Sequence, residues 1–440
     1  MNTQSNFHFD AIVLGAGISG LVSASVIERQ GVKNILIADE YDHPGGNHIN
    51  VNIDEYTFDI GSFIFQDDSP LLAHFPELLD HYIPIEVSLE RLNPQGKVTR
   101  YPISVKEDIL AAGPLVIARI LLSAAKARLF HHQQNGARAF ARFWIGDYLL
   151  RRSGLENYME RFNGAKASKI DLDFAQRRMG WIKEHAMVAT HIKRFFQPLA
   201  PATNTQMVRP FDGFAPLYEH AQNNLEARGI SFALGKEIQE IRKVGDLFEI
   251  NIGGSQYTTE RVISTVPIPK TQTLCGLNVD DKLQSVTLVS LFFSFEGDRG
   301  FIAPVMFNFS YDGAWKRITM HSDFYGLRKG RQFFCVEVIS SDTSSSVEAA
   351  EKDFREHVQA NGLFKGELKL EGGHVLQNAY PVYINNASQR AKDAMEQLAE
   401  FGIESIGRQG RFDYQPTARA STVEAEALLE AQAKTNAQPR

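Results

Sequence analysis

The sequence predicts an α/β protein that begins with a Rossmann-like domain. Three features near the N-terminus predict this fold class. The apolar run 9–14 leads directly into the glycine-rich segment 15–20 (GAGISG), residues 21–29 have helical composition, and residues 34–38 form a second apolar run. A glycine turn at the first corner of such a strand–helix–strand unit is typical of domains that bind dinucleotides.

The three glycines of that turn, Gly15-x-Gly17-x-x-Gly20, have separate roles. Gly15 allows the tight turn, Gly17 lets a pyrophosphate approach the backbone, and Gly20 lets the helix pack closely on the strand. The phosphates would lie at the helix N-terminus, where free N–H groups and the helix dipole favour anions. Asp39 ends the next strand and is placed to accept hydrogen bonds from ribose hydroxyls. Glu40 is the neighbouring alternative, but strand register favours Asp39.

Length and composition indicate an ordinary globular protein of about two or three structural units. The chain has 440 residues, of which 43% are hydrophobic and 22% charged, and its formal net charge is −6. The absence of a basic excess argues against a general nucleic-acid surface. Cys275 and Cys335 are far apart and are expected to be free thiols. The histidine pair 131–132, His185 and His191 have no acidic partner at a suitable spacing, so no metal site is expected.

The N-terminus lacks a signal-peptide pattern, and no run of about 18 apolar residues occurs. We therefore expect a cytoplasmic protein without a transmembrane segment. The most apolar stretch, Ile109 to Phe130, contains Arg119, Lys126 and Arg128, and it is read as an amphipathic helix. It is expected to pack within a substrate domain, with weak peripheral contact with a membrane as the alternative.

The chain changes character after about residue 102. Strand signals fade, and the segments 108–128, 137–152 and 174–185 show the periodicity of helices. A helix and a small β-meander then return to the first domain, and several β-rich runs indicate a second sheet. The expected division is 1–100, 205–275 and 400–440 for a discontinuous dinucleotide-binding domain, 101–204 for a helical substrate-region insertion, and 276–399 for a substrate-domain sheet with helices.

A second glycine segment, Gly45-Gly46-Asn47, follows Asp39 closely, and a double glycine lets the backbone pass close to a cofactor. The whole pattern of strand, GAGISGL, strand, acid and GGN resembles the flavoprotein superfamily that contains protoporphyrinogen oxidase, the amine oxidases and UDP-galactopyranose mutase. The segment FDIG, which ends in Gly61, is similar to the superfamily's next element and by this resemblance lies near the flavin ring. The resemblance implies FAD as a tight, non-covalent cofactor.

Two later segments also resemble this superfamily. The first is a helix followed by a strand segment that leads to Ile238 and back into the dinucleotide-binding domain. By this resemblance, the backbone of Ile238 contacts adenine. Gly407-Arg408, followed by Tyr414, resembles the C-terminal segment that reaches the flavin. A helix that starts near 417–422 would direct free N–H groups toward the flavin and stabilise its anionic reduced form. The superfamily's usual Asp shortly after the Tyr is missing here.

The resemblance implies two alternative reactions. The first is an FAD-dependent oxidoreductase, like the amine or protoporphyrinogen oxidases, that transfers hydride from a small organic substrate to FAD. The aromatic residues Phe63 and Phe65 would suit it beside the flavin. The second is a redox-neutral mutase, like UDP-galactopyranose mutase, that uses reduced FAD. We expect the oxidoreductase, because the histidines that mutases carry after the Asp-x-Gly element are absent. A non-enzymatic FAD-binding protein is a third alternative.

Arg317, Tyr380 and Tyr414 are the candidate catalytic residues. Arg317 resembles the mutase arginine that holds a diphosphate, and both tyrosines resemble mutase tyrosines. Each has a structural alternative, since a strand arginine is as often ion-paired and buried tyrosines often belong to the core. The arginine pairs 151–152 and 177–178 are expected on helix faces, with binding of an acidic substrate as the alternative. The expected partners are a small-molecule substrate, a nucleotide-sugar in the mutase case, and a second copy of the chain in a homodimer, but no nucleic acid.

Overall fold

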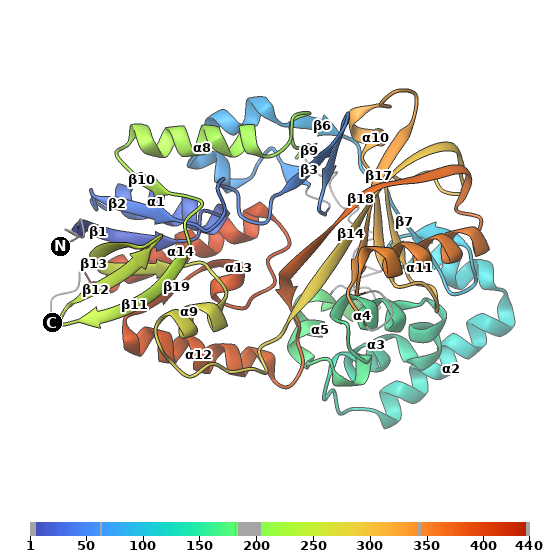
Figure 1. The fold of residues 1–440 in the computed structure, drawn as a ribbon. Coiled ribbons are helices and arrows are strands. Elements are labelled where there is room, and N and C mark those ends of the chain that lie inside the picture. The colour runs from blue at the N-terminus through green and yellow to red at the C-terminus, as the bar shows by residue number, and fades with distance from the viewer. Residues whose placement is uncertain (1–5, 62–63, 181, 184–203, 342–344, 437–440) are drawn as a thin grey trace.

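Two seven-stranded sheets lie side by side in the computed structural model, which describes residues 6–61, 64–180, 182–183, 204–341 and 345–436. The first sheet carries the N-terminal glycine turn, and the second lies next to the helical part of the chain (Figure 1). This arrangement confirms the predicted α/β class, with a Rossmann-like domain and a second unit of mixed sheet and helices.

The first sheet is assembled from the beginning, the middle and the end of the chain. Its strands are β1 (Asn6–Leu14), β2 (Ile35–Ala38), β10 (Ser231–Ala233), β11 (Ile238–Val244), β12 (Leu247–Ile252), β13 (Ser255–Ser264) and β19 (Ile403–Ser405). β1 pairs in parallel with β2 and β13, β10 extends the sheet beyond β2, and β19 joins the end of β13. β11, β12 and β13 form the antiparallel meander that the sequence predicts.

The helices of this half bring the C-terminal segment back to the glycine turn. They are α1 (Ile18–Arg29), α8 (Ala215–Ala227), α9 (Ile268–Leu274), α12 (Ala387–Phe401), α13 (Gly407–Gly410) and α14 (Ala418–Asn436). α1 is buried from Ile18 to Ile27, and α14 packs along it. The first described strand, β1, and the last described helix, α14, consequently both belong to this half of the molecule (Figure 1).

The second sheet is antiparallel over most of its width. In spatial order its strands are β18 (Phe364–Pro381), β14 (Ser285–Arg299), β17 (Gln332–Ile339), β16 (Trp315–Met320), β15 (Val305–Asn308), β7 (Leu89–Leu92) and β8 (Val98–Arg100). Successive residues of β14 point to opposite faces, as the pleat requires. Leu291 and Phe293 join the core beneath α11 (Val347–Ala360), while Leu288 and Phe292 face the rest of the molecule. β7 and β8 lie within the segment 1–100 but pair in this second sheet.

Two small sheets lie between the large ones in the chain: β3 (Asn50–Ile53) with β4 (Tyr56–Asp59), and β5 (Phe65–Gln66) with β9 (Gln206–Val208) and β6 (Ile83–Ile85). The β3–β4 ribbon contacts the second sheet directly. The ring of Phe58 stacks on Phe292 with 4.9 Å between centroids, and the Ser290 hydroxyl donates to the Ile60 carbonyl at 2.9 Å. Gly61, which follows, is buried at this junction.

The helical region contains α2 (Pro114–Phe130), α3 (Ala137–Arg152), α4 (Leu155–Asn163) and α5 (Leu172–Arg178). The short helices are η1 (Pro70–Ala73), η2 (Pro76–His81), η3 (Val105–Ile109), η4 (Leu110–Ala112), η5 (Ala167–Lys169) and α10 (Ser322–Tyr325). The helix expected from residue 108 begins only at Pro114, because Gly113 adopts a φ of +87° and the proline starts a new helix. α2 lies at the edge of the molecule away from the termini (Figure 1).

None of the described helices is by itself long and apolar enough to cross a membrane. Residues 105–112 and α2 reach the required length and composition only as a pair, and they are bent by 112° relative to each other.

Candidate cofactor and substrate site

Two of the three glycines in the N-terminal turn are required by packing, and the third is not. Gly15 has a φ of +102°, and a Cβ there would lie 2.2 Å from Thr265 Oγ1. A Cβ on Gly20 would lie 1.9 Å from the carbonyl oxygen of Gly15. A Cβ on Gly17, by contrast, would meet only Gly46, at an ordinary 3.6 Å. The bare backbone of Gly17, at the start of α1, therefore fits the close approach of a pyrophosphate rather than a need of the chain itself.

Asp39 lies beside this turn. Its Oδ2 accepts the N–H of Ala16 at 2.5 Å, and its Oδ1 accepts the N–H of Tyr41 at 2.9 Å. Burial raises the pKa of the Asp39 carboxyl, and these two hydrogen bonds oppose the rise. The neighbouring Glu40 is directed elsewhere, since its carboxylate pairs with Lys270. Of the two adjacent acids, Asp39 is the one that contacts the glycine turn.

Ile238 lies at the edge of the same region. It begins β11, and its N–H points to the carboxylate of Glu40 at 3.4 Å. Glu40, Ile238 and Lys270 line a shallow groove of about 730 Å³. The residue expected to contact adenine therefore borders an open groove beside the end of β2.

The second glycine segment packs directly on the first turn. The N–H of Gly45 donates to the carbonyl of Ala16 at 2.9 Å. Gly45 has a φ of +111°, and a Cβ there would lie 2.6 Å from the ring of Tyr218. A Cβ on Gly46 would lie 3.0 Å from the Cα of Gly17, and Asn47 follows, half-buried. The two glycine segments thus form one continuous backbone surface.

The C-terminal segment reaches the same place from the other end of the chain. Gly407 has a φ of +81°, and a Cβ there would lie 2.3 Å from the Ser19 hydroxyl on α1. Arg408 donates to the carbonyl of Ala379. Burial, aided by the charge of Arg408, lowers the pKa of His48, the residue after Asn47, to about 3.

α14 starts at Ala418, within the range where the sequence predicts a helix start. The Thr417 hydroxyl accepts the N–H of Ala420 at 3.3 Å and so caps the first turn. Thr417 and Ala418 lie against Phe65 of β5. Phe63, expected beside Phe65, lies outside the described residues, as do His185 and His191.

Arg317 is ion-paired, which is the structural alternative that the sequence left open. Its guanidinium and the Lys316 ammonium share the carboxylate of Glu337 on β17, with 2.6 Å between Lys316 Nζ and Glu337 Oε2. A β-bulge at this point of β16 lets both neighbours reach one partner. Burial would raise the pKa of Glu337, but Arg317 and Lys316 hold it below its ordinary value. Burial lowers the pKa of Lys316 to about 8.

Tyr380 and Tyr414 come together in an aromatic cluster at the end of β18. Tyr380 stacks on Phe162 with centroids 4.9 Å apart and meets Tyr414 edge-on at 6.2 Å. Lys316 Nζ donates to the Tyr380 hydroxyl at 3.0 Å. Burial raises the pKa of Tyr380 well above its ordinary value, so its hydroxyl stays protonated. Arg408 lies 5.9 Å from the Tyr414 ring, which connects this cluster to the C-terminal segment.

Arg178 belongs to the pair 177–178, for which the sequence left binding of an acidic substrate as the alternative to a place on a helix face. Its guanidinium lies 3.7 Å from the centre of the Tyr414 ring and 5.3 Å from that of Phe162, and it pairs with none of the carboxylates that the structure describes. Its neighbour Arg177 pairs with Asp413 instead. Adjacent arginines on α5 therefore differ in role, a difference that the pair 177–178 gives no means of predicting. We call Arg178, Phe162, Tyr380 and Tyr414 the aromatic–cationic cluster.

A small cavity of about 40 Å³ opens on this cluster, and its lining includes Tyr101, Tyr158, Phe162, Phe174 and Arg178. The Asp that the superfamily usually carries after Tyr414 has no replacement there. The Tyr414 N–H instead donates to the hydroxyl of Tyr383 at 2.8 Å, which fixes the segment. Within the described part of the chain, no group of three or more His, Cys, Asp or Glu side chains is arranged to hold a metal ion.

Comparisons of sequence support the dinucleotide-binding assignment at the N-terminus. Residues 13–79 match a family described as an NAD(P)-binding Rossmann-like domain. Prolycopene isomerase of Daucus carota is 43% identical over 56 residues, which are 13% of this chain and only 9% of that protein. An uncharacterised protein from the nifH2 3′ region of Methanothermococcus thermolithotrophicus is 32% identical over 108 residues, which are 22% of this chain and 94% of that protein.

Solved structures match the chain over almost its whole length. A reduced UDP-galactopyranose mutase has a TM-score of 0.78 at 15% identity, covering 98% of this chain and 96% of that one. A protein assigned as a protoporphyrinogen oxidase from Exiguobacterium sp. 255-15 has a TM-score of 0.72 at 14% identity, covering 98% and 99%. A putrescine oxidase has a TM-score of 0.56 at 13% identity, covering 98% and 100%. The chain thus belongs to one family with the Methanothermococcus protein, and it has the fold of these UDP-galactopyranose mutase, protoporphyrinogen oxidase and putrescine oxidase structures.

Proposed function

We propose that this chain binds FAD and oxidises a small, anionic organic substrate by hydride transfer to the flavin. The observation that carries the proposal is the meeting of the two chain ends on α1. The glycine turn opens α1, Gly407 packs on Ser19 in its first turn, and Arg408 then leads to the aromatic–cationic cluster. A dinucleotide held along this path would have one end at Asp39 and the other beside Tyr414.

The residues present fit FAD by the nature of their donors and acceptors. The N–H groups at the start of α1 and the backbone of Gly17 would hold the pyrophosphate. Asp39 would accept the ribose hydroxyls, and the backbone of Ile238 would contact adenine. Gly407 and the first turn of α14 would support the flavin end, where the positive end of the helix dipole favours negative charge on the reduced ring. When bound, FAD supplies the hydride acceptor.

The aromatic–cationic cluster would bind the substrate. Arg178 is held between two aromatic rings and can offer its guanidinium to a carboxylate or phosphate. Tyr380 already accepts a hydrogen bond from Lys316, so its own proton is available to donate to the substrate. The aromatic walls of the small cavity exclude water from the reacting bond. Hydride loss from the carbon beside a neutral amine leaves an iminium ion, so for an amine this step requires no acid–base residue of the protein.

The redox-neutral mutase stays the second candidate, and one observation favours it. Arg178 lies over Tyr414, Lys316 contacts Tyr380, and Arg408 lies near both rings, so three cations gather where a departing diphosphate would require them. Against it, Arg317, which resembles the mutase arginine that holds the diphosphate, is ion-paired with Glu337.

An anaerobic experiment separates the two candidates. The purified protein is first mixed with panels of amines, alcohols and hydroxy acids, without a reductant, and the flavin absorbance is followed. We expect a substrate-dependent bleaching that a carboxylate or phosphate on the substrate strengthens. The protein is then reduced with dithionite and tested for interconversion of UDP-hexoses. Interconversion that occurs only in the reduced state, together with no bleaching by any substrate, would replace the oxidoreductase proposal with the mutase.

A further inference from the structure

α2 presents an apolar face that nothing within the described structure covers. Leu115, Leu122 and Leu129 recur every seven residues on one side of the helix, and they are 80%, 70% and 68% exposed. Phe130 beside them is 72% exposed. Single exposed leucines are ordinary, but an aligned row on one helix marks a surface that meets another apolar phase. We call this row with Phe130 the α2 apolar face.

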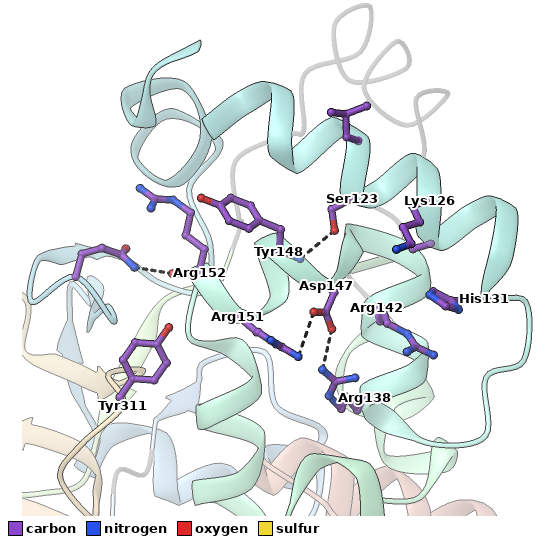
Figure 2. A pocket seen from close by; sticks show the side chains of 13 residues that line it. Ser123, Lys126, His131, Arg138, Arg142, Asp147, Tyr148, Arg151, Arg152 and Tyr311 are labelled. Carbon is purple, nitrogen blue, oxygen red and sulfur yellow. Dashed lines mark hydrogen bonds and ion pairs between the residues drawn. The ribbon is translucent and has the colours of Figure 1, made fainter. Parts of the chain in front are cut away.

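A cationic cavity of about 770 Å³ borders the α2 apolar face (Figure 2). Leu122 belongs to both, and Lys126 lines the cavity from the same helix. The cavity is otherwise lined largely by basic side chains, namely His131, Arg138, Arg142, Arg151 and Arg152. It lies in the helical region and shares no lining residue with the aromatic–cationic cluster.

Only part of this positive charge is neutralised inside the protein. Arg138 and Arg151 share the carboxylates of Asp147 and Glu156, with 2.7 Å between Arg138 Nη2 and Asp147 Oδ1 (Figure 2). Within the described chain, Lys126, Arg142 and Arg152 have no such partner, and the Nε atoms of Arg142 and Arg152 are buried without a hydrogen-bond acceptor. These three cations are therefore available to an anionic ligand from outside the chain.

From the apolar row and the adjoining unpaired cations, we propose that α2 docks the protein on an anionic phospholipid bilayer. The helix lies in the plane of the interface with its leucines among the acyl chains, while Lys126, Arg142 and Arg152 hold lipid phosphates. This assignment does not depend on the flavin chemistry proposed above.

Charge selects this occupant over a second copy of the chain. α2 contains Arg119, Lys126 and Arg128 but no Asp or Glu. A two-fold contact through the α2 apolar face would therefore place basic residues against their own copies without an acidic partner on the helix. A soluble anion would satisfy the cavity but would leave the leucines exposed to water.

Vesicle flotation with the full-length protein tests the proposal. We expect binding to vesicles of phosphatidylglycerol and phosphatidylcholine in equal amounts, at least about tenfold weaker binding to phosphatidylcholine alone, and weakening by salt. Leu122→Ser and Leu129→Ser should each reduce binding by about tenfold or more, because each removes apolar burial. Lys126→Gln and Arg142→Gln should each reduce it about fivefold, on the anionic vesicles only.

Ile302→Ser is the matched control, because Ile302 is 83% exposed but lies next to the second sheet, far from α2 in the chain. It should bind vesicles like the wild type. Circular dichroism should show that the serine variants keep their helix content, since both leucines face solvent. Absence of vesicle binding by the wild type, or unchanged binding by both serine variants, would overturn the proposal. It would equally be overturned if inorganic pyrophosphate bound the cavity while vesicles did not, or if the serine variants only converted a dimer to monomers.

Discussion

The dinucleotide cradle and the aromatic–cationic cluster are built in different ways. The cradle consists of the two N-terminal glycine segments, Asp39 and Gly407. It is built mainly from glycine backbone, because a Cβ at most of these glycines would clash with neighbouring atoms. The cluster consists of four large side chains from separate elements. One of them, Tyr380, accepts a hydrogen bond from Lys316, which pairs with the buried carboxylate of Glu337. The cradle therefore follows from residue spacing along short segments, whereas the cluster exists only once the whole fold has formed.

Gly17→Glu should break the cradle alone and gives the largest expected effect. A carboxylate at the start of α1 would occupy the pyrophosphate position, so FAD affinity should fall by at least about a thousandfold. FAD binding is measured by fluorescence titration, and folding by circular dichroism. Gly17→Ala is the control for folding, since a Cβ there makes only an ordinary 3.6 Å contact with Gly46, and its methyl group should weaken FAD binding less than the carboxylate does. Full retention of FAD by Gly17→Glu would show that the cradle does not hold the pyrophosphate.

Glu337→Gln should damage the support of the cluster rather than the cradle. It leaves Lys316 and Arg317 without their shared counter-charge in a buried position, which costs about 3–5 kcal/mol of unfolding free energy. Urea unfolding measures the loss. Glu240→Gln removes a carboxylate from an exposed pair with Arg242 and should cost about 1 kcal/mol or less. Equal losses of unfolding free energy in the two variants would show that Glu337 and its two cations stabilise the fold no more than an exposed ion pair does.

Arg178→Gln should affect substrate binding while sparing the fold. It removes the unpaired guanidinium beside Tyr414, so the KM of the substrate found by flavin bleaching should rise about 10- to 100-fold. The control is Arg177→Gln, because Arg177 pairs with Asp413 and is 55% exposed. The KM of both variants is measured by steady-state kinetics. If the KM rose equally in both, the distinction drawn between the adjacent arginines would be wrong.

His321→Phe probes the junction between the two regions. His321 is buried near the rings of Phe58 and Phe333, and burial, aided by Arg209, holds its pKa well below the ordinary value. A lowered histidine pKa means that the folded state binds fewer protons than the unfolded state. Its stabilising effect is thus complete above about pH 6.5 and is lost as the pH falls below that value.

The wild type should therefore lose about 1.4 kcal/mol more unfolding free energy than His321→Phe between about pH 7.5 and pH 5.5. Urea unfolding at both pH values measures the difference. Identical losses would mean that His321 titrates normally in the folded protein.

The sequence predicts the cradle better than the cluster for a physical reason. Gly20 contacts Gly15, and Asp39 contacts Ala16, within one short unit, so their spacing alone indicates these contacts. The contact of Gly15 with Thr265 comes from much later in the chain. The pairing of Arg317 with Glu337 requires a β-bulge and the alignment of two strands, and single-residue patterns encode neither. Arg178 becomes distinct from Arg177 only through the approach of Tyr414 from the far end of the chain.

The same limit applies to the overall architecture. The predicted α/β class is confirmed because strand and helix periodicities are local properties. The helix expected from residue 108 starts later, at Pro114, because a single glycine turn interrupts an otherwise continuous apolar pattern. Likewise, β7 pairs with β15 of the second sheet and β8 pairs with β7, and the residues of these two strands do not reveal this long-range pairing.

The identity of the bound nucleotide tests the central claim most directly. The full-length protein is purified without added cofactor, its visible spectrum is recorded, and the ligand released by heat is identified by chromatography and mass spectrometry. We expect flavin absorbance from the purified protein and FAD in the released fraction. Any colourless fraction should take up FAD on titration. A colourless protein that takes up NAD or NADP but not FAD would contradict it.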